Sequence, residues 1–338
     1  MSATIHVEKR PTSMAASQQA IIWHRFRRHR RGVIALLVLA LITLGVIFVP
    51  IFSPFQYYTI ADGSLWLAPP GASNEYGQVH WLGTDFLGRD LFTRLFFGGR
   101  ISLLVAFCAA AIVVLIGTVV GSIAGFYGGW IDTILMRVTD FMLALPLLPM
   151  FVLVIRFLRT SLIPLTIAPR GTPLTGNRPP EDETFTIVAS MVLVFVIFGW
   201  MGIARLVRGS ILSLRESTFV EASVALGAGH RRLIFKHLIP NSIAPILVAA
   251  TFALGDFIIW EAVLSYMGQG IAEAFIPTWG NLLAISQDYI WHLGTLNPFE
   301  DIAGYMLLFP TFMILVTVLA LNYIGEALRD AFDPHGRV

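Results

Sequence analysis

Charged residues and cysteines are scarce in this sequence, and each scarcity narrows the class of protein. Only 13% of the 338 residues are Asp, Glu, Lys or Arg, whereas 56% are hydrophobic. Soluble domains carry about 25% charged residues, so the composition argues against an ordinary soluble domain. The single cysteine, Cys108, excludes a disulfide framework and a metal site built from cysteines. A membrane protein fits both observations.

The sequence also lacks the motifs of ATPases and of common hydrolases. A phosphate-binding loop ends in Gly-Lys-Ser/Thr, but the only two lysines, Lys9 and Lys236, follow Glu8 and Phe235. Neither a His-Glu-x-x-His zinc motif nor a Gly-x-Ser-x-Gly nucleophile elbow occurs. We therefore expect no catalytic residue, no metal ligands and no bound cofactor in this chain.

Long uncharged runs are abundant instead. A helix crosses the hydrocarbon core of a bilayer with about 20 residues, and the runs predict an all-α membrane protein with six transmembrane helices. The expected helices cover residues 32–52, 101–126, 133–158, 184–208, 242–266 and 302–325. The expected external loops are 53–100, 159–183 and 267–301, and the expected cytoplasmic parts are the tails 1–31 and 326–338 and the loop 209–241.

Five arginines immediately before the first run set the expected orientation. They are Arg25, Arg27, Arg28, Arg30 and Arg31. By the positive-inside rule they place the N-terminus in the cytoplasm, and six crossings return the C-terminus there. A nucleic-acid-binding arm is disfavoured because an apolar run follows at once. A cleaved signal peptide is disfavoured because its apolar region would be only about 7–15 residues long.

The expected cytoplasmic loop contains start and stop signals for two short helices. Thr218 can cap a helix, and Glu221, three residues later, can close a capping box. Gly227 and Gly229 can supply the turn that ends this helix, because glycine accepts positive φ. A second amphipathic segment follows, and Pro240 is expected to end it.

The run Glu-Ala-Ser, three residues, Gly, nine residues and His-Leu-Ile-Pro resembles the cytoplasmic loop of membrane subunits in ABC importers. Ser223 and Ile239 stand where that family usually has Ala and Leu. The resemblance implies a type I importer permease bundle whose coupling helices lie in a groove of the ATPase. It assigns ATPase coupling to Thr218, Glu221, Ala222, Ser223, Leu226, Gly227, Ala228, His237 and Pro240. The alternative is an ordinary connector whose Glu221 only caps a helix.

A second resemblance lies before the second apolar run. His-Trp-Leu-Gly-Thr-Asp, from His80, followed by Gly98-Gly99-Arg100, resembles the dipeptide/oligopeptide branch of ABC permeases, in its C-type subunit. Alternating acids and arginines with glycine turns predict a small ion-paired cap over the outer mouth. The expected cap or gate residues are Trp81, Gly83, Asp85, Gly88, Arg89, Asp90 and Arg100. A structural loop is favoured over direct contact with the substrate.

Three later stretches also resemble this branch. Leu264–Gly270 and Pro277–Leu283 follow the fifth apolar run, and Leu321–Pro334 ends the sixth. In the first of them, Tyr266-Met267 stand where the branch usually has Phe-Leu, and Gln269 stands where it has Leu. These differences leave the cargo open.

Several residues inside the apolar runs invite specific hypotheses. The ladder Gly117, Gly121 and Gly125 permits close approach of another helix, from this chain or from a partner. Three residues apart on the third run, Arg137 and Asp140 can pair on one helix face.

Asp256 is an unexpected charge in the outer half of the fifth run. A carboxylate at that depth should face protein or water rather than lipid. One hypothesis is that Asp256 lines the translocation path and attracts a cation such as a peptide amino terminus, and the alternative is a structural pair with a neighbouring helix. Glu261, nearer the outer boundary, is assigned a gate or a structural role.

Together these features predict the permease subunit of an ABC importer for oligopeptides or dipeptides in the inner membrane of a prokaryote. The expected partners are a second, different permease, two ATPase subunits, an external substrate-binding protein and the lipid bilayer, with no nucleic acid. The same architecture with a nickel chelate or an antimicrobial peptide as cargo is one alternative. An intramembrane hydrolase that uses Asp256 and an ion-driven carrier are the others.

Overall fold

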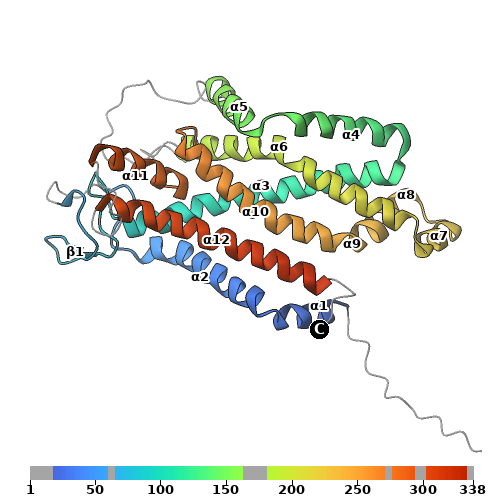
Figure 1. Cartoon of the computed structure of the whole chain (residues 1–338), viewed down its shortest axis with the longest axis horizontal. Helices are drawn as coiled ribbons and strands as arrows, with labels where there is room; N and C mark the ends of the chain where they lie inside the picture. The colour runs from blue at the N-terminus through green and yellow to red at the C-terminus, as the bar shows by residue number, and fades with distance from the viewer. Residues whose placement is uncertain (1–17, 60–64, 163–180, 271–275, 294–301, 333–338) are drawn as a thin grey trace, which may run out of the picture.

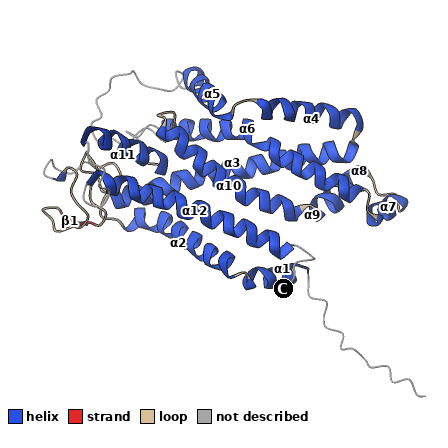
Figure 2. Ribbon diagram, in the orientation of Figure 1, coloured by secondary structure: helices blue, strands red, loops and turns tan. Residues whose placement is uncertain are grey.

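The computed structural model describes residues 18–59, 65–162, 181–270, 276–293 and 302–332. These residues form an elongated bundle of helices (Figure 1), and Figure 2 shows that strand is confined to one end. The five long helices are α2 (Arg30–Phe52), α3 (Leu91–Tyr127), α6 (Glu181–Arg215), α10 (Ile243–Tyr266) and α12 (Ile302–Phe332). All five are long and apolar enough to cross a membrane.

Shorter elements complete the two ends of the bundle. The hairpin end contains the antiparallel strands β1 (Ala72–Ser73) and β2 (Val79–His80), with α11 (Trp279–Leu293) beside them. The loop end, residues 215–242, contains α7 (Thr218–Ala225), α8 (His230–Arg232), a π-helical turn (Leu233–Leu238) and α9 (Ile239–Asn241). The remaining helices are α1 (Gln18–Arg28), α4 (Gly129–Ala144) and α5 (Leu147–Leu162).

The predicted third transmembrane helix, 133–158, is not one continuous helix. The chain forms α4 and α5 there, bent by 92°, and only together do they pass as one broken span. Proline disfavours the helical conformation of the residue before it and cannot donate its own backbone hydrogen bond. Leu145, before Pro146, accordingly has an extended backbone with ψ 138°. The described residues therefore hold five spans, or six if the bent pair is counted.

Three helices extend beyond the spans that the uncharged runs predict. The second helix begins at Leu91 rather than 101, because the Asp90 carboxylate accepts a hydrogen bond from the Thr93 N–H at 2.7 Å and caps it. The fourth helix continues to Arg215 and the sixth to Phe332. An uncharged run marks the thickness of the bilayer, whereas a helix ends where its backbone is capped or broken.

Besides losing residues 91–100 to α3, the predicted external loops differ from the structure at a second place. The predicted loop 267–301 contains a helix, α11. The greater part of the predicted loop 159–183 lies outside the described residues.

The centre of the bundle is the contact between α3 and α6. A Cβ atom placed on Gly121 would lie 2.4 Å from the Ala204 carbonyl oxygen, and one on Gly125 would lie 2.9 Å from the Arg208 carbonyl oxygen. Gly117 approaches Ile203 in the same way, at 2.8 Å. The glycine ladder therefore packs against α6 of the same chain, which decides between the two partners that the sequence leaves open.

Candidate functional site

The loop end begins where α6 leaves the bundle. Ser217 occupies the cap position of α7, but its hydroxyl donates to the Leu214 carbonyl and does not cap the helix. Thr218 is the first helical residue, and the Glu221 N–H donates to the Ser217 carbonyl at 3.3 Å. The predicted capping box between Thr218 and Glu221 is therefore wrong: the cap position lies one residue earlier, at Ser217, it has no side-chain cap bond, and the Glu221 side chain is exposed.

The other end of α7 is a tight glycine turn. Gly227 has φ +82°, its N–H donates to the Val224 carbonyl at 2.9 Å, and the Ala228 N–H donates to the Ser223 carbonyl at 3.0 Å. These two bonds form a Schellman motif, which requires a left-handed residue at that position. The prediction for Gly227 is confirmed. Gly229 has φ −72° and adds no such turn, so that part of the prediction is wrong.

The second segment of the loop is continuous helical backbone with an irregular turn. Residues Leu233–Leu238 are π-helical, and Pro240 lies inside α9, which ends one residue later at Asn241. Pro240 therefore does not itself end the segment, because a proline near the start of a helical turn costs no intrahelical bond. His237 is half-buried, and its carbonyl accepts a hydrogen bond from the Asn241 side chain at 2.6 Å.

Buried residues fix this loop to the bundle. Val220, Leu233 and Leu238 are buried in the main core. The Arg215 guanidinium donates to the Phe126 carbonyl at 2.9 Å, and the His230 ring meets the Phe126 ring edge-on at 5.2 Å. The base of the loop is therefore held against the end of α3.

The tip of the loop presents apolar side chains outward. Leu226 is 89% exposed, Phe235 is 62% exposed, and Phe219 and Val224 are also exposed. Ala222 and Gly227 are exposed beside them. A hollow of about 680 Å³ lies between α7 and the end of α3, lined by Tyr127, Glu221, Val224, Ala228, His230 and others. Apolar side chains gathered on a surface next to a hollow mark a protein interaction site.

Two ion pairs connect α4 to α6 near this end. Arg208 holds Asp132 with two nitrogens, the Nη2–Oδ2 distance being 2.6 Å, and Arg205 pairs with Asp140. The predicted pair between Arg137 and Asp140 is therefore wrong, because the arginine that reaches Asp140 comes from another helix. Arg205 and Arg208 were not among the predicted residues, although their three-residue spacing inside a long apolar helix was a signal.

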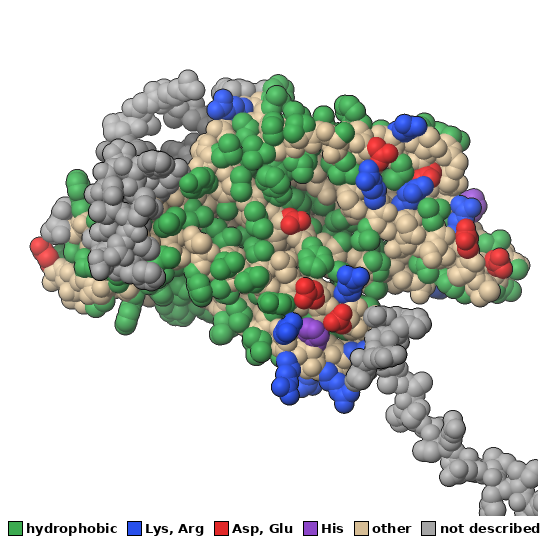
Figure 3. All heavy atoms as spheres, in the orientation of Figure 1, with side chains coloured by type: hydrophobic (Ala, Val, Ile, Leu, Met, Phe, Trp, Pro, Cys, Tyr) green, Lys and Arg blue, Asp and Glu red, His purple; other side chains and the backbone are tan. Residues whose placement is uncertain are grey.

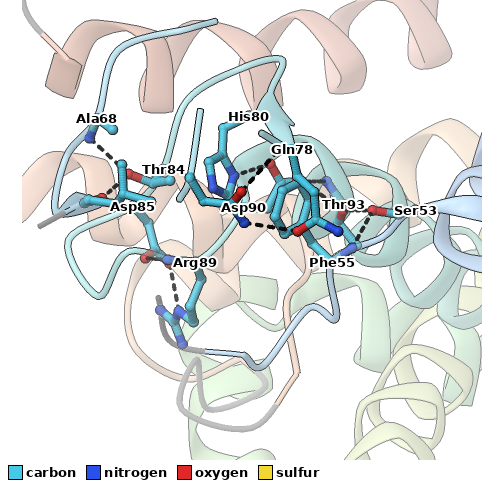
Figure 4. Close-up of polar contacts among 12 residues, drawn as sticks. Ser53, Phe55, Ala68, Gln78, His80, Thr84, Asp85, Arg89, Asp90 and Thr93 are labelled. Carbon is cyan, nitrogen blue, oxygen red and sulfur yellow. Dashed lines mark hydrogen bonds and ion pairs between the residues drawn. The ribbon is translucent and has the colours of Figure 1, made fainter. Parts of the chain in front are cut away.

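At the hairpin end, Asp85 is the centre of a buried cluster (Figure 4). Its carboxylate lies 2.7 Å from Arg89 Nε and 3.4 Å from Arg94 Nε. It also accepts hydrogen bonds from the backbone N–H groups of Leu87 and Arg89, both at 2.9 Å. Asp85 is fully buried and Arg89 is 4% exposed. The predicted Asp85–Arg89 pair is present, but it is buried rather than exposed.

A second buried pair lies next to it. Asp90 Oδ1 is 2.9 Å from His80 Nδ1, and the His80 ring stacks on Phe55 with centroids 4.1 Å apart (Figure 4). Gly83 and Gly88 take positive φ values of 79° and 74°, so the chain can turn tightly around these side chains. The loop therefore folds around its own charges.

Two of the predicted cap residues lie apart from this cluster. Trp81 is 70% exposed. Arg100 lies on α3, where it donates to the Ile47 carbonyl at 2.9 Å and lies over the Phe97 ring. The geometry thus brings together Gly83, Asp85, Gly88, Arg89 and Asp90, and leaves Trp81 and Arg100 outside.

Glu261 is a buried junction of three helices. Its carboxylate accepts hydrogen bonds from Ser102 on α3 at 2.9 Å and from Ser265 on α10 at 2.8 Å. Ser102 also accepts from the Trp279 N–H, the first residue of α11, at 3.2 Å. Of the two roles expected for Glu261, a gate or a structural residue, these contacts favour the structural role.

Residues around α11 were missed as contributors to this junction. The Trp279 indole donates to the Leu95 carbonyl at 3.0 Å, and Asn281 donates to the Ile276 carbonyl at 2.7 Å. Gly98 and Gly99 leave room for them, since a Cβ on Gly99 would lie 2.7 Å from the Trp279 ring. The signal was present in the Pro-Thr-Trp-Gly-Asn run and the Gly-Gly pair, which the sequence analysis treated as separate motifs.

Asp256 has surroundings unlike those of Glu261. It is exposed, and Phe252 and Ile259, one turn away on either side of it on α10, are exposed as well. Among the residues whose side chains are described, none makes a hydrogen bond or an ion pair with Asp256. The alternative of a structural pair therefore finds no partner in the described part of this chain.

Two family models match parts of this chain. Residues 117–338 match the family "Binding-protein-dependent transport system inner membrane component", and residues 17–70 match the "N-terminal TM domain of oligopeptide transport permease C". A chain of the inward-facing MetNI methionine ABC transporter aligns with a TM-score of 0.49 at 18% identity, covering 70% of this chain and 96% of that chain.

Curated relatives match nearly the whole length. The oligopeptide permease protein OppC of Bacillus subtilis is 36% identical over 314 residues, covering 92% of this chain and 87% of that protein. The dipeptide permease protein DppC of Alkalihalophilus pseudofirmus is 35% identical over 310 residues, covering 92% and 88%. The chain therefore belongs to the family of binding-protein-dependent transport system inner membrane components, as a multi-pass permease subunit of an ABC importer and not an enzyme.

Proposed function

We propose that this chain forms half of a pathway that imports oligopeptides or dipeptides across the inner membrane of a prokaryote. The relatives named for oligopeptide and dipeptide transport support the cargo. Five or six spans are few to enclose a peptide, so a second permease supplies the other half. We expect that subunit to have a different sequence of the same branch, because the C-type subunit implies a counterpart.

The observation that carries this proposal is the exposed apolar tip of the loop end. Leu226, Phe219 and Val224 extend from a short helix whose base is buried in the bundle. Such a tip fits a groove of an ATPase subunit. The paired arrangement then needs two ATPase subunits, which bind ATP and Mg²⁺ while this chain binds no cofactor.

Movement reaches the bundle through the buried base of the loop. Thr218, Glu221, Ala222, Ser223 and Gly227 form or flank the contact. When the ATPase subunits close, α7 is displaced, and Val220 and Leu233 transmit the displacement to α3 and α6.

The orientation follows from the same assignment. The loop end and both termini lie in the cytoplasm, and the hairpin end faces outward. The buried Asp85 and Asp90 clusters then cap the outer mouth, where a substrate-binding protein delivers the peptide. The exposed Trp81 supplies a surface for that protein.

The translocation path follows the exposed face of α10. There the carboxylate of Asp256 attracts the positively charged amino terminus of a peptide, while Glu261 holds the outer ends of the helices together. An unpaired carboxylate within the bilayer is costly, so it must face water or a cation when the complex is assembled.

Peptide uptake into proteoliposomes that contain the complete importer tests these assignments. Glu221→Ala should reduce the peptide imported per ATP hydrolysed while membrane insertion stays normal. Asp256→Asn should weaken uptake of peptides with a free amino terminus more than uptake of acetylated ones. Normal coupled uptake in the first variant contradicts the coupling assignment, and equal effects on both peptides in the second contradict the pathway assignment.

Other cargoes remain distinguishable by one measurement. A nickel chelate or an antimicrobial peptide would use the same architecture. A ligand screen on the binding protein encoded with this chain separates these cargoes from ordinary peptides. A hydrolase and an ion-driven carrier are not proposed, because the family is one of binding-protein-dependent transport.

A further inference from the structure

Arginines surround the point where α1 turns into α2, and the functions proposed above use none of them. Arg27 and Arg28 end α1, and Arg30 and Arg31 begin α2. All four side chains are exposed. We propose that this arginine cluster binds the headgroups of anionic phospholipids, so that α1 is a lipid-binding arm at the membrane surface.

The arm is fixed on the bundle. Phe26 is 5% exposed and packs against Ala327 and Ala331 of α12. The turn after α1 is set by His29, whose Nδ1 accepts a hydrogen bond from the Gly32 N–H at 3.1 Å and whose Nε2 lies 3.4 Å from Asp330. The arginines are therefore presented from a defined position instead of from a free tail.

The lipid-facing side of α2 leads directly to this cluster. Ile34, Leu37, Leu41, Leu44 and Phe48 are all exposed, and their spacing of three and four residues places them on one face of the helix. Arg30 lies four residues before Ile34 and continues that face. If the apolar stripe contacts hydrocarbon, Arg30 lies at the level of the headgroups.

Trp23 marks the same level on α1. It is 56% exposed and lies one helical turn before Arg27, so the two residues share a flank of the helix. Tryptophan is enriched where a membrane meets water, because its ring is apolar and its N–H is polar. An exposed tryptophan next to an exposed arginine therefore fits a headgroup layer.

The net charge of this surface is positive. The exposed acidic side chains in the last two turns of α12 are Glu326 and Asp330, and Asp330 already pairs with His29. Arg329 and Arg25 add to the basic side. In Figure 3 basic side chains gather at the end of a broad hydrophobic face. A guanidinium group binds a phosphate with two hydrogen bonds, which makes arginine well suited to phospholipid headgroups.

Native mass spectrometry of the purified importer complex tests the proposal. Phosphatidylglycerol and phosphatidylcholine are titrated separately, and the affinity of the tightest site for each is compared. Arg30→Gln should lower the preference for phosphatidylglycerol about fivefold, the factor set by roughly 1 kcal/mol per basic residue near an anionic membrane surface. Replacing all four arginines by glutamine should abolish the preference.

The matched control changes Arg231 and Arg232 to glutamine, since these arginines are exposed at the loop end but continue no lipid-facing stripe. This control should keep the full preference. An unchanged preference in the four-arginine variant overturns the proposal. So does displacement of phosphatidylglycerol by inorganic phosphate, which would indicate a site for free anions. Loss of the second permease or of an ATPase subunit from the four-arginine variant also overturns it, because the cluster would then be a protein interface.

Discussion

The hairpin end and the loop end of this protein differ in which side chains they bury: the hairpin end buries charged groups, whereas the loop end exposes apolar groups. At the hairpin end, Asp85 and Asp90 are buried and paired with Arg89 and His80. At the loop end, Leu226 and other apolar side chains point outward. The difference indicates that the hairpin end gains its stability within the chain, whereas the loop end is completed by another subunit.

The comparison predicts the largest loss of stability for Asp85→Ala. This change removes a fully buried carboxylate that lies 2.7 Å from Arg89 Nε and 3.4 Å from Arg94 Nε, and Arg89 is itself only 4% exposed. Breaking a buried ion pair by removing one partner costs about 3–5 kcal/mol. The midpoint of thermal unfolding should fall strongly, and Glu75→Ala on the exposed turn of the hairpin serves as the control. Equal midpoints for the two variants would contradict the view that the buried ion pairs within this chain stabilise the hairpin end.

The same substitution, glycine to alanine, made once at each end tests how tightly each end is packed. A Cβ on Gly280 would lie 2.6 Å from the Ala262 backbone, whereas one on Gly229 meets nothing within 4 Å. Gly280→Ala should therefore cost about 1–3 kcal/mol by overpacking, and Gly229→Ala should be nearly neutral. Thermal unfolding of both variants checks this. A larger loss for Gly229→Ala would reverse the assignment of rigid and open ends.

Gly227→Ala should have a smaller and local effect. The left-handed conformation costs a residue with a Cβ roughly 1–2 kcal/mol, although the space around Gly227 is open. The Schellman turn should loosen while the midpoint of global unfolding changes little. Hydrogen exchange at the Ala228 amide, which bonds to the Ser223 carbonyl, measures the loosening. Unchanged protection of that amide would contradict the prediction.

Leu226→Ser should have the smallest effect on stability, within about 0.5 kcal/mol, because the side chain is 89% exposed. Its effect on assembly should be large, since it removes an apolar group from the proposed ATPase contact. Co-purification of ATPase subunits measures that contact, and Ser213→Ala, exposed on the neighbouring helix, is the control. If Leu226→Ser unfolds the isolated chain instead, the tip belongs to the core of this subunit.

The sequence predicts the helical class, the spans and the position of the loop because each depends on a local pattern. Apolar runs about one bilayer long reveal α2 and α10 almost to the residue. The glycine at the end of α7 is predictable because the left-handed turn requires it.

The errors arise where a distant residue decides the outcome. Asp140 can pair along its own helix, but Arg205 of α6 reaches it. The cap of α3 is Asp90, which a search for uncharged residues places in a loop. Ser102 and Trp279 meet only after folding, across 177 residues of chain. The sequence around Ser102 does not predict that contact, and neither does the sequence around Trp279.

The glycine contact between α3 and α6 has a mechanical consequence. α3 runs for 37 residues, about 55 Å at 1.5 Å per residue, from the Asp85 cluster to the hollow beneath α7. Between Gly117 and Gly125 the carbonyl oxygens of α6 lie where a Cβ atom on α3 would otherwise stand, so the two helices are in close backbone contact there. We therefore expect α3 and α6 to move together as one rigid unit, so that a displacement at Tyr127 is carried along α3 to Leu91.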